Sequence, residues 1–471
     1  MKKQLVITAA LSFLLLGTLT GCGGGKKTLP PFEMPENGYD GSKVQITFYH
    51  AMGQDLQAKL QNHISKFEEM YPTIDVVDKY IGNYDAVRDQ LVNEISIGEG
   101  ANIAYCYPDH IALYNKSKRV VTLDQFMDDQ TQRSFTTDDG KEIKYTFGFT
   151  QEEKDDFVKP YFEEGRIFGD GKTYSLPFAK STELLYYNKT FFDKHNLTVP
   201  TTWDEMWNVC AKIKEIDPHA TPLGYDSDSN WFITLCEQYG SGYTSDDPNN
   251  HFLFNNAENK KWLQDLKDKY QKGYFTTKGL LGTYTSSIFT ETNTGDDVIR
   301  SYMSIGSSAG AVHQRPQADN AGQYPFEVDV APIPQVDVNN PKAIQQGPSL
   351  CIFNHKDPQV VCASWLFVKY IERDLELQAD ISKLNGYTPV LKSVSEIPVY
   401  KKWLEHSKDI QARAVKVCIE ERDTNFISPA FVGSSKARDQ VGGALTAIIS
   451  GAKTIDTALQ DAYDECDYAA S

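Results

Sequence analysis

Three polar residues that could bind a small molecule follow predicted strands in the N-terminal half of the chain. His50 ends the first strand, Tyr84 lies in the turn after the second, and Asp109 follows the third. The carboxylate of Asp109 can accept hydrogen bonds from two hydroxyl groups, and Tyr84 offers both a ring face and a hydroxyl. His50 has no second histidine at metal-ligand spacing. Structural alternatives stay open for all three: a packed tyrosine, an N-cap aspartate and a buried histidine.

Two further groups lie later in the chain. Trp231 is the best candidate for stacking on a ring-shaped ligand, because axial C–H groups pack on an electron-rich ring. Ser307 and Ser308, between Gly306 and Gly310, predict a cradle of N–H and hydroxyl donors at a helix N-terminus. Such a cradle suits hydroxyl groups or an anion, and a plain Gly/Ser loop is the alternative.

The elements that must position the first three residues alternate between strands and helices. Apolar residues alternate with polar ones in 44–49, and further short strands are predicted over 74–77 and 103–107. Helical spacing of apolar residues is found in 56–70 and 87–95. Strands joined by single helices imply right-handed crossovers and a parallel sheet, whose ligands bind beyond the carboxyl ends of the strands.

A second α/β region is predicted from about residue 174 onward. Thr202 and Glu205 have capping-box spacing before an apolar helix, and residues 326–333 alternate as a strand. Asp357 precedes Pro358 at the start of another amphipathic helix. After residue 389 the chain is predicted to be mainly helical.

Length and charge restrict the class of protein. The chain has 471 residues, and a single core seldom grows beyond about 250–300 residues, so two lobes are expected. Its 64 acidic residues outnumber 47 basic ones, giving a formal charge of −17. Nucleic-acid binding depends on clustered Lys and Arg, so a nucleic-acid partner is excluded.

The N-terminus has the order of a secretory signal. Lysines precede an apolar run that is too short for a membrane span, so residues 1–21 are predicted to be removed. Cys22 directly after Leu19-Thr20-Gly21 resembles a bacterial lipobox and predicts lipidation. Residues 22–43 are predicted to be a lipidated, flexible tether. The other seven cysteines form no CxxC motif, so neither a disulfide framework nor a thiolate metal site is indicated.

Many ordered motifs across residues 44–465 resemble one family. They look like the family 1 extracellular solute-binding proteins, the lipoproteins of ABC importers related to maltose- and glycerol-3-phosphate-binding proteins. The matching segments are FYHAMG (48–53), FEEMYPTIDV (67–76), GNYDAV (82–87), GKTYSLPFAKST (171–182), LYYNKTFF (185–192), PTTWDEM (200–206), SIGSSAG (304–310), QQGPSLCIF (345–353) and NGYTPV (385–390).

The resemblance implies an α/β, two-lobed periplasmic-binding-protein-like fold of type II, with the ligand in the cleft between the lobes. Three hinge crossings are expected, and closure around the ligand would be recognised by the importer. The crossings are placed at 178–183, 346–349 and 384–387. Lobe one is then 44–180 plus 348–384, and lobe two is 184–346 plus 386–471.

The resemblance also implies ligand-binding residues. Ser181 matches a serine that donates to the ligand, Gly347 would let the backbone approach it closely, and Tyr387 would cover it. Phe431, ahead of Gly433, aligns where the glycerol-3-phosphate branch has an arginine for the phosphate. An aromatic ring cannot replace a bidentate cation, so a neutral mono- or oligosaccharide is favoured over a phosphodiester.

A nearby cation such as Arg315 or Arg438 would overturn that preference for a neutral ligand. The expected protein is not an enzyme, needs no cofactor or metal, and is a monomer on the outer face of the cytoplasmic membrane. Its expected partners are a carbohydrate, ABC permease subunits and, through them, an ATPase.

Other functions stay open. A glycerol-3-phosphate- or glycerophosphodiester-binding protein is the nearest alternative. A secreted glycoside hydrolase would need a pair of carboxylates, for which Asp109, Glu183 and Asp228 are available. A surface adhesin or sensor that has lost its transporter is the third alternative.

Overall fold

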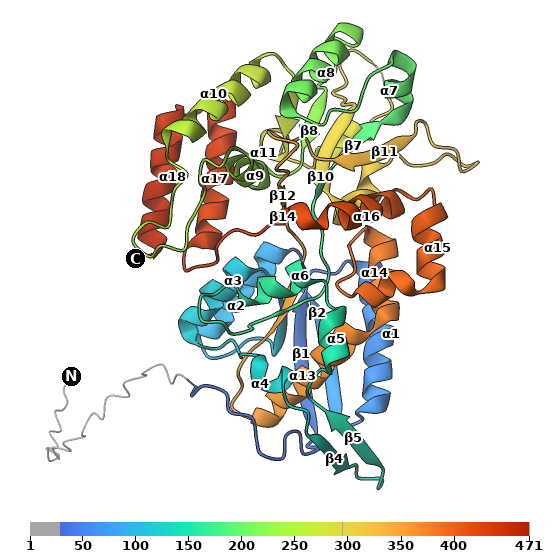
Figure 1. The fold of residues 1–471 in the computed structure, drawn as a ribbon, viewed down its shortest axis with the longest axis vertical. Helices are drawn as coiled ribbons and strands as arrows, with labels where there is room; N and C mark the ends of the chain where they lie inside the picture. Colours follow the sequence, from blue (N-terminus) through green and yellow to red (C-terminus); the bar gives the residue numbers. More distant parts are fainter. Residues whose placement is uncertain (1–28, 294, 471) are drawn as a thin grey trace, which may run out of the picture.

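The computed structural model describes residues 29–293 and 295–470. Two α/β lobes lie one above the other, each built on its own five-stranded sheet (Figure 1). The predicted signal peptide and the predicted lipidation at Cys22 lie outside the described residues. No helix of the described part of the chain is long and apolar enough to cross a membrane.

The first sheet has the strand order β2-β1-β3-β13-β6. Strands β1, β2 and β3 are parallel, which confirms the sheet predicted from the N-terminal pattern. Strands β13 and β6 join it antiparallel, so the complete sheet is mixed. Its members are β1 (Val44–His50), β2 (Ile74–Tyr80), β3 (Ile103–Cys106), β6 (Leu176–Pro177) and β13 (Ser349–Ile352).

Amphipathic helices cover this sheet. In α1 (Gln54–Met70), Leu56, Leu60, Ile64 and Phe67 are buried on one face, as their spacing predicts. These side chains share one core with α13 (Pro358–Arg373). The other helices beside this sheet are α2 (Tyr84–Ser96), α3 (Pro108–Tyr114) and α14 (Leu375–Asn385).

The described part of the predicted tether packs on the first lobe. The ring of Phe32 stacks on Phe126 at 5.4 Å, and Tyr39 is only 1% exposed. The hydroxyl of Tyr145 donates to the carbonyl of Tyr39 at 2.7 Å. The prediction of a flexible tether is therefore wrong for this part, because apolar side chains between the Gly and Pro residues are buried in the lobe.

The second sheet has the order β11-β7-β10-β8-β9. β7 runs antiparallel to both of its neighbours, whereas β10, β8 and β9 are parallel. The start of β7 and the ends of β10, β8 and β9 therefore meet at one edge. The strands are β7 (Glu183–Asn188), β8 (Leu223–Tyr225), β9 (Phe275–Thr277), β10 (Met303–Ser307) and β11 (Val328–Pro332).

The helices of the second lobe follow the sequence signals closely. In α8 (Trp203–Ile216), Thr202 and Glu205 form the predicted capping box. Trp207 lies in the core of this lobe together with Trp231 and Leu445. The remaining helices of this lobe are α7 (Lys189–His195), α9 (Asp228–Tyr239), α10 (Ala257–Gln271), α16 (Ile410–Glu421), α17 (Ser434–Ile449) and α18 (Ile455–Ala470).

Shorter elements complete the chain. A β4 (Gln132–Thr136) and β5 (Glu142–Thr146) hairpin projects from the first lobe, and β12 (Ala343–Ile344) pairs with β14 (Asn425–Phe426) (Figure 1). The short helices are α4 (Asp124–Met127), α5 (Gln151–Asp156), α6 (Lys159–Glu163), α11 (Lys278–Leu281), α12 (Ser286–Phe289) and α15 (Pro398–His406). The 3₁₀ helices are η1 (Asn115–Ser117), η2 (Glu164–Arg166), η3 (Ser308–Gln314), η4 (Lys392–Glu396) and η5 (Arg422–Thr424).

The segments predicted as crossings run side by side. Lys180 and Thr388 exchange backbone hydrogen bonds, and Ser181 does the same with Gln346. Gly347 has a φ of +94°, and a Cβ there would lie 2.2 Å from the carbonyl oxygen of Ala179. Only glycine fits this close approach between the first and second crossings.

Packing after the third predicted crossing differs from the predicted lobe division. Val390, Leu391, Val394 and Tyr400 are buried in the core of the first lobe, although the division at residue 386 placed them in the second. α16 then packs against the second sheet through Ile410 and its neighbours. The chain therefore covers the first lobe for about one more helix before it enters the second.

Candidate functional site

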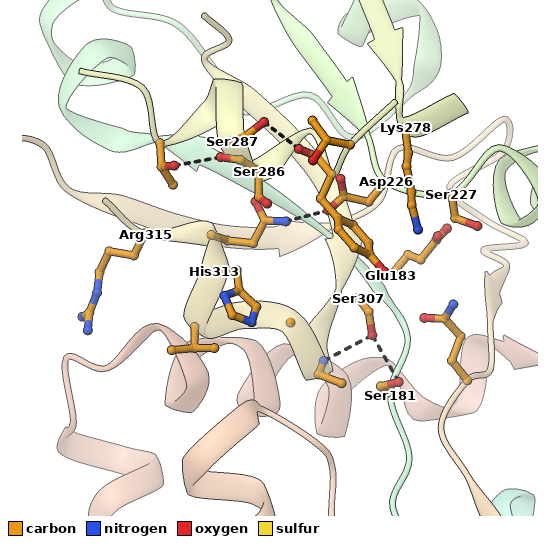
Figure 2. Close-up of a pocket in the computed structure, with 18 of the residues that line it drawn as sticks. Ser181, Glu183, Asp226, Ser227, Lys278, Ser286, Ser287, Ser307, His313 and Arg315 are labelled. Atoms are coloured by element: carbon orange, nitrogen blue, oxygen red, sulfur yellow. Dashed lines mark hydrogen bonds between the residues drawn. The ribbon is translucent and has the colours of Figure 1, made fainter. Parts of the chain in front are cut away.

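A cavity of about 1020 Å³ lies where the two lobes meet. Its lining includes Tyr84 and Tyr107 from the first lobe and Glu183, Asp226 and Ser307 from the second. The second-lobe residues lie together because the start of β7 and the ends of β8 and β10 share one edge of the sheet. Figure 2 shows these side chains converging on the cavity.

Hydroxyl groups are numerous in the part of the cavity lining that comes from the second lobe and the first crossing. Ser307 donates a hydrogen bond to the hydroxyl of Ser181 at 3.3 Å, and its own oxygen accepts from the N–H of Ala309 (Figure 2). Hydroxyls that can both donate and accept suit a ligand with many hydroxyl groups. The lining residues that carry these hydroxyls are Ser181, Ser227, Ser286, Ser287, Thr290 and Ser307.

Tyrosines form the opposite side. The hydroxyls of Tyr84 and Tyr387 lie 2.7 Å apart, and the ring of Tyr107 lies edge-on to Tyr84 at 5.1 Å. Burial raises the pKa of all three hydroxyls, so they stay protonated. This side can therefore offer ring faces and neutral hydroxyls to a ligand.

Two acidic groups of the lining already have hydrogen-bond donors. Glu183 accepts from the hydroxyl of Tyr225 and, at 2.8 Å, from the amide of Asn230. Burial raises the pKa of Glu183 from 4.5 to about 7. Asp226 accepts from the N–H and hydroxyl of Thr285 and from Gln314, and burial raises its pKa as well.

Basic side chains line the same cavity. Lys278 begins α11 directly after β9, and Arg438 lies in the first turns of α17. Arg315 follows η3 at the other side of the cavity, across from Lys278 in Figure 2. Sequence reasoning missed Lys278, although a charged residue at the end of a strand was the signal that drew attention to Asp109.

The structure brings together about half of the predicted site residues. Tyr84, Ser181, Ser307, Gly347 and Tyr387 all line the large cavity. They come from distant parts of the sequence, and the pairing of the crossings unites them. Their role in binding remains a prediction.

Asp109 and Ser308 lie close to the cavity without lining it. Asp109 lines a smaller neighbouring cavity of about 330 Å³, which shares Tyr84, Tyr107 and Arg438 with the large one. Ser308 is fully buried, and its N–H donates to the carbonyl of Thr182 at 2.8 Å. Of the two serines of the predicted cradle, only Ser307 lines the cavity, where Ala309 and Gly310 join it.

The structure contradicts the prediction that Trp231 stacks on a ligand. Trp231 is 0% exposed, and its ring stacks on Tyr225 at 4.5 Å and lies 5.7 Å from Trp203. It belongs to the core of the second lobe, because the apolar face of α9 packs against the sheet there. It lines neither of the two cavities.

His50 and Phe431 make contacts elsewhere in the fold. The Nδ1 atom of His50 accepts from the N–H of Met52 at 3.1 Å, and its Nε2 lies 3.3 Å from Asp78. Burial lowers the pKa of His50. Phe431 stacks on His251 at 3.9 Å. Neither residue lines the described cavities, so the structure does not bring them to the predicted site.

One cluster outside the cavities has the geometry of metal ligands. It consists of His63, Asp374 and Glu376. Asp374 caps α14 by accepting from the N–H groups of Glu376 and Leu377, and it also contacts His63. Glu376 pairs with Lys66 at 2.8 Å. These hydrogen bonds and ion pairs explain why the three side chains lie together: they connect α1 with the start of α14.

Comparisons with known proteins agree with the geometry. Residues 62–408 match the family described as bacterial extracellular solute-binding protein. The sn-glycerol-3-phosphate-binding periplasmic protein UgpB of Yersinia pseudotuberculosis is 24% identical over 431 residues, which cover 89% of this chain and 90% of that protein. The protein of Escherichia coli K12 with the same name is 23% identical over 433 residues, covering 89% and 91%.

Solved structures show the same fold. The substrate-binding protein Lmo0181 of Listeria monocytogenes, in complex with cycloalternan, superposes with a TM-score of 0.70 at 17% identity, covering 91% of this chain and 99% of that one. UgpB of Mycobacterium tuberculosis, in complex with glycerophosphocholine, gives 0.69 at 15% identity, covering 90% and 98%. At these identities the likeness concerns the fold, which is the predicted two-lobed one.

Proposed function

Because the chain belongs to the bacterial extracellular solute-binding proteins, we propose that it captures a carbohydrate by lobe closure and delivers it to the permease of an ABC importer. The observation that carries this proposal is the cavity of about 1020 Å³ at the junction of two lobes. Serine and threonine hydroxyls face tyrosine rings across it, as a mono- or oligosaccharide requires.

Binding between lobes gives the proposed mechanism. A ligand that contacts both Ser307 and Tyr84 stabilises the closed arrangement more than any open one. Paired segments at Lys180–Thr388 and Ser181–Gln346 supply a narrow connection about which the lobes could turn. The proposed division keeps the first two crossings at 178–183 and 346–349, and the packing of Val390 and Tyr400 moves the third boundary past the predicted 384–387.

The remaining parts of the proposal concern location and partners. Lipidation of Cys22 would hold a monomer on the outer face of the cytoplasmic membrane, where permease subunits coupled to an ATPase receive the ligand. The protein would perform no chemistry on its ligand. One of the three candidate carboxylates supports this: Asp228 accepts from Thr277, Gly279 and Thr446, and it lines neither cavity.

A phosphate-containing ligand is the second candidate. It is favoured by the names of relatives such as UgpB and by the position of Arg438 at the cavity. The aromatic residue Phe431, found where a phosphate-binding arginine was expected, argued against a phosphate-containing ligand. Arg438 supplies a cation from the start of α17 instead.

Differential scanning fluorimetry and calorimetry across saccharides and glycerophosphodiesters test the proposal. Purified protein from residue 29 onward should bind at least one saccharide. Binding should raise the melting temperature of the protein, and the ligand should be recovered intact. A cleaved ligand, or binding of no saccharide, would contradict it.

A further inference from the structure

The cavity contains an excess of unpaired positive charge. Lys278, Arg315 and Arg438 line it, and none of them forms an ion pair with a carboxylate of the described residues. The chain as a whole carries a formal charge of −17, so acids are plentiful elsewhere. Cations without an ion-pair partner in the lining of one cavity of an acidic protein favour an anionic ligand.

Arg438 is held in place by a chain of buried hydrogen bonds. One guanidinium N–H donates to the side-chain oxygen of Asn230, which is 2% exposed. The amide of Asn230 donates in turn to Glu183 at 2.8 Å. The other guanidinium N–H groups have no acceptor among the described residues, so an oriented fork of donors is available at the cavity.

Lys278 is similarly available. Its Nζ lies 3.8 Å from the ring centroid of Tyr284, a contact that leaves the ammonium donors free for an acceptor. Asp226 has its own donors from Thr285 and Gln314. Burial raises the pKa of Glu183 to about 7, so this carboxyl is about half protonated at pH 7.

Asp439, the residue after Arg438, is engaged at the contact between the lobes. Asp439 lies 3.5 Å from Arg88, which also pairs with Asp85 and Asp89. Asp109 lines only the smaller cavity. In the lining of the large cavity three cations therefore outnumber Asp226 and the partly protonated Glu183, so the net charge that a ligand meets there is positive.

We propose that the ligand is an acidic saccharide, whose carboxylate, sulfate or phosphate group is bound by Arg438 and Lys278 while its hydroxyls contact the serine and tyrosine walls. This inference rests on the proposed function and narrows its substrate class. The cavity volume of about 1020 Å³ fits an oligosaccharide and greatly exceeds the needs of glycerol 3-phosphate. The sequence-based preference for a neutral sugar rested on the aromatic Phe431, and the structure supplies cations from α11 and α17.

The test compares matched ligand pairs by isothermal titration calorimetry. Suitable pairs are trigalacturonate with galactotriose, and glucose 6-phosphate with glucose; the first pair probes carboxylate and the second phosphate. The acidic member should bind about tenfold to a hundredfold tighter, since a charge-assisted hydrogen bond contributes that much. The difference should shrink as ionic strength rises.

Variants assign the effect to the named residues. Arg438→Gln and, separately, Lys278→Gln should each reduce the preference for the acidic member by about tenfold while neutral binding persists. Lys272→Gln removes one charge from the same lobe outside both cavities and should leave the preference unchanged. Thermal melts verify that each variant is folded, and Lys278→Gln keeps the test valid if Arg438→Gln is unstable.

The outcomes separate this inference from the proposed function. Equal or tighter binding of the neutral members, or an unchanged preference in both cavity variants, would overturn the inference and leave the proposed function intact. Binding of glycerol 3-phosphate with no saccharide of either charge, or binding of no ligand, would overturn both.

Discussion

A buried ion pair at the connection between the lobes gives the sharpest prediction for stability. Lys180 is 0% exposed and contacts Glu164, which is 2% exposed. Its ammonium also donates to the carbonyl of Gly347 at 3.1 Å and to the hydroxyl of Ser349 at 3.0 Å. Gln345 donates to the other oxygen of Glu164 at 3.0 Å. The pair thus joins the first and second crossings.

Replacing Lys180 by Met leaves the carboxylate of Glu164 buried without its counter-charge. Removal of one partner from such a pair costs about 3–5 kcal/mol of unfolding free energy. Urea denaturation followed by tryptophan fluorescence measures this change. The double variant Lys180→Met/Glu164→Gln should recover part of the loss, because no buried charge remains in it.

A surface pair provides the matched control. Lys59 and Asp380 lie 3.0 Å apart with 43% and 24% of their side chains exposed. Lys59→Met should change the unfolding free energy by no more than about 1 kcal/mol. The reasoning is refuted if Lys180→Met costs as little as Lys59→Met, or if the double variant is less stable than Lys180→Met alone.

Three further predictions concern single residues. Gly347→Ala should lower the unfolding free energy by about 2 kcal/mol or more and weaken ligand binding, because the added Cβ meets the backbone of Ala179 and φ at this position is positive. Urea denaturation measures the stability and calorimetry the affinity; wild-type values of both quantities would contradict the prediction. Trp231→Phe should lower the melting temperature yet leave ligand affinity unchanged, since Trp231 is buried away from the cavity; a large loss of affinity in a folded variant would restore the stacking hypothesis. Burial raises the pKa of Glu183 from 4.5 to about 7, so its contribution to the unfolding free energy is full below about pH 4.5 and is lost as the pH rises through 7. The variant Glu183→Gln does not titrate, so between about pH 5 and pH 8 its stability should rise relative to that of the wild type, by on the order of 3 kcal/mol at most. A difference in unfolding free energy that does not depend on pH would contradict this prediction.

Local patterns predicted much of the fold. The spacing of Leu56, Leu60 and Ile64 identified the buried face of α1, and Thr202 with Glu205 identified the start of α8. These features depend on residues within a few positions of each other. Sheet membership depends on distant pairing, so local patterns did not show that β13 and β6 complete the first sheet antiparallel.

The site was predicted best where a strand end or a crossing placed it. Tyr84 and Ser181 line the cavity for that reason. Trp231 was misassigned because the residue type and its sequence neighbours do not distinguish an exposed stacking surface from a core position against Tyr225. Arg438 was named only as a cation that would change the ligand preference, and Lys278 was missed, because tertiary packing alone brings α11 and α17 to one cavity.

The central claim is that two lobes close around a hydroxyl-rich molecule that is not chemically altered. Small-angle X-ray scattering with and without a saturating amount of the saccharide that gives the largest thermal shift tests it most directly, with mass spectrometry of the recovered ligand. The account predicts a smaller radius of gyration with ligand and an intact ligand. Superimposable scattering curves in the presence of confirmed binding, or recovery of a cleaved saccharide, would contradict it.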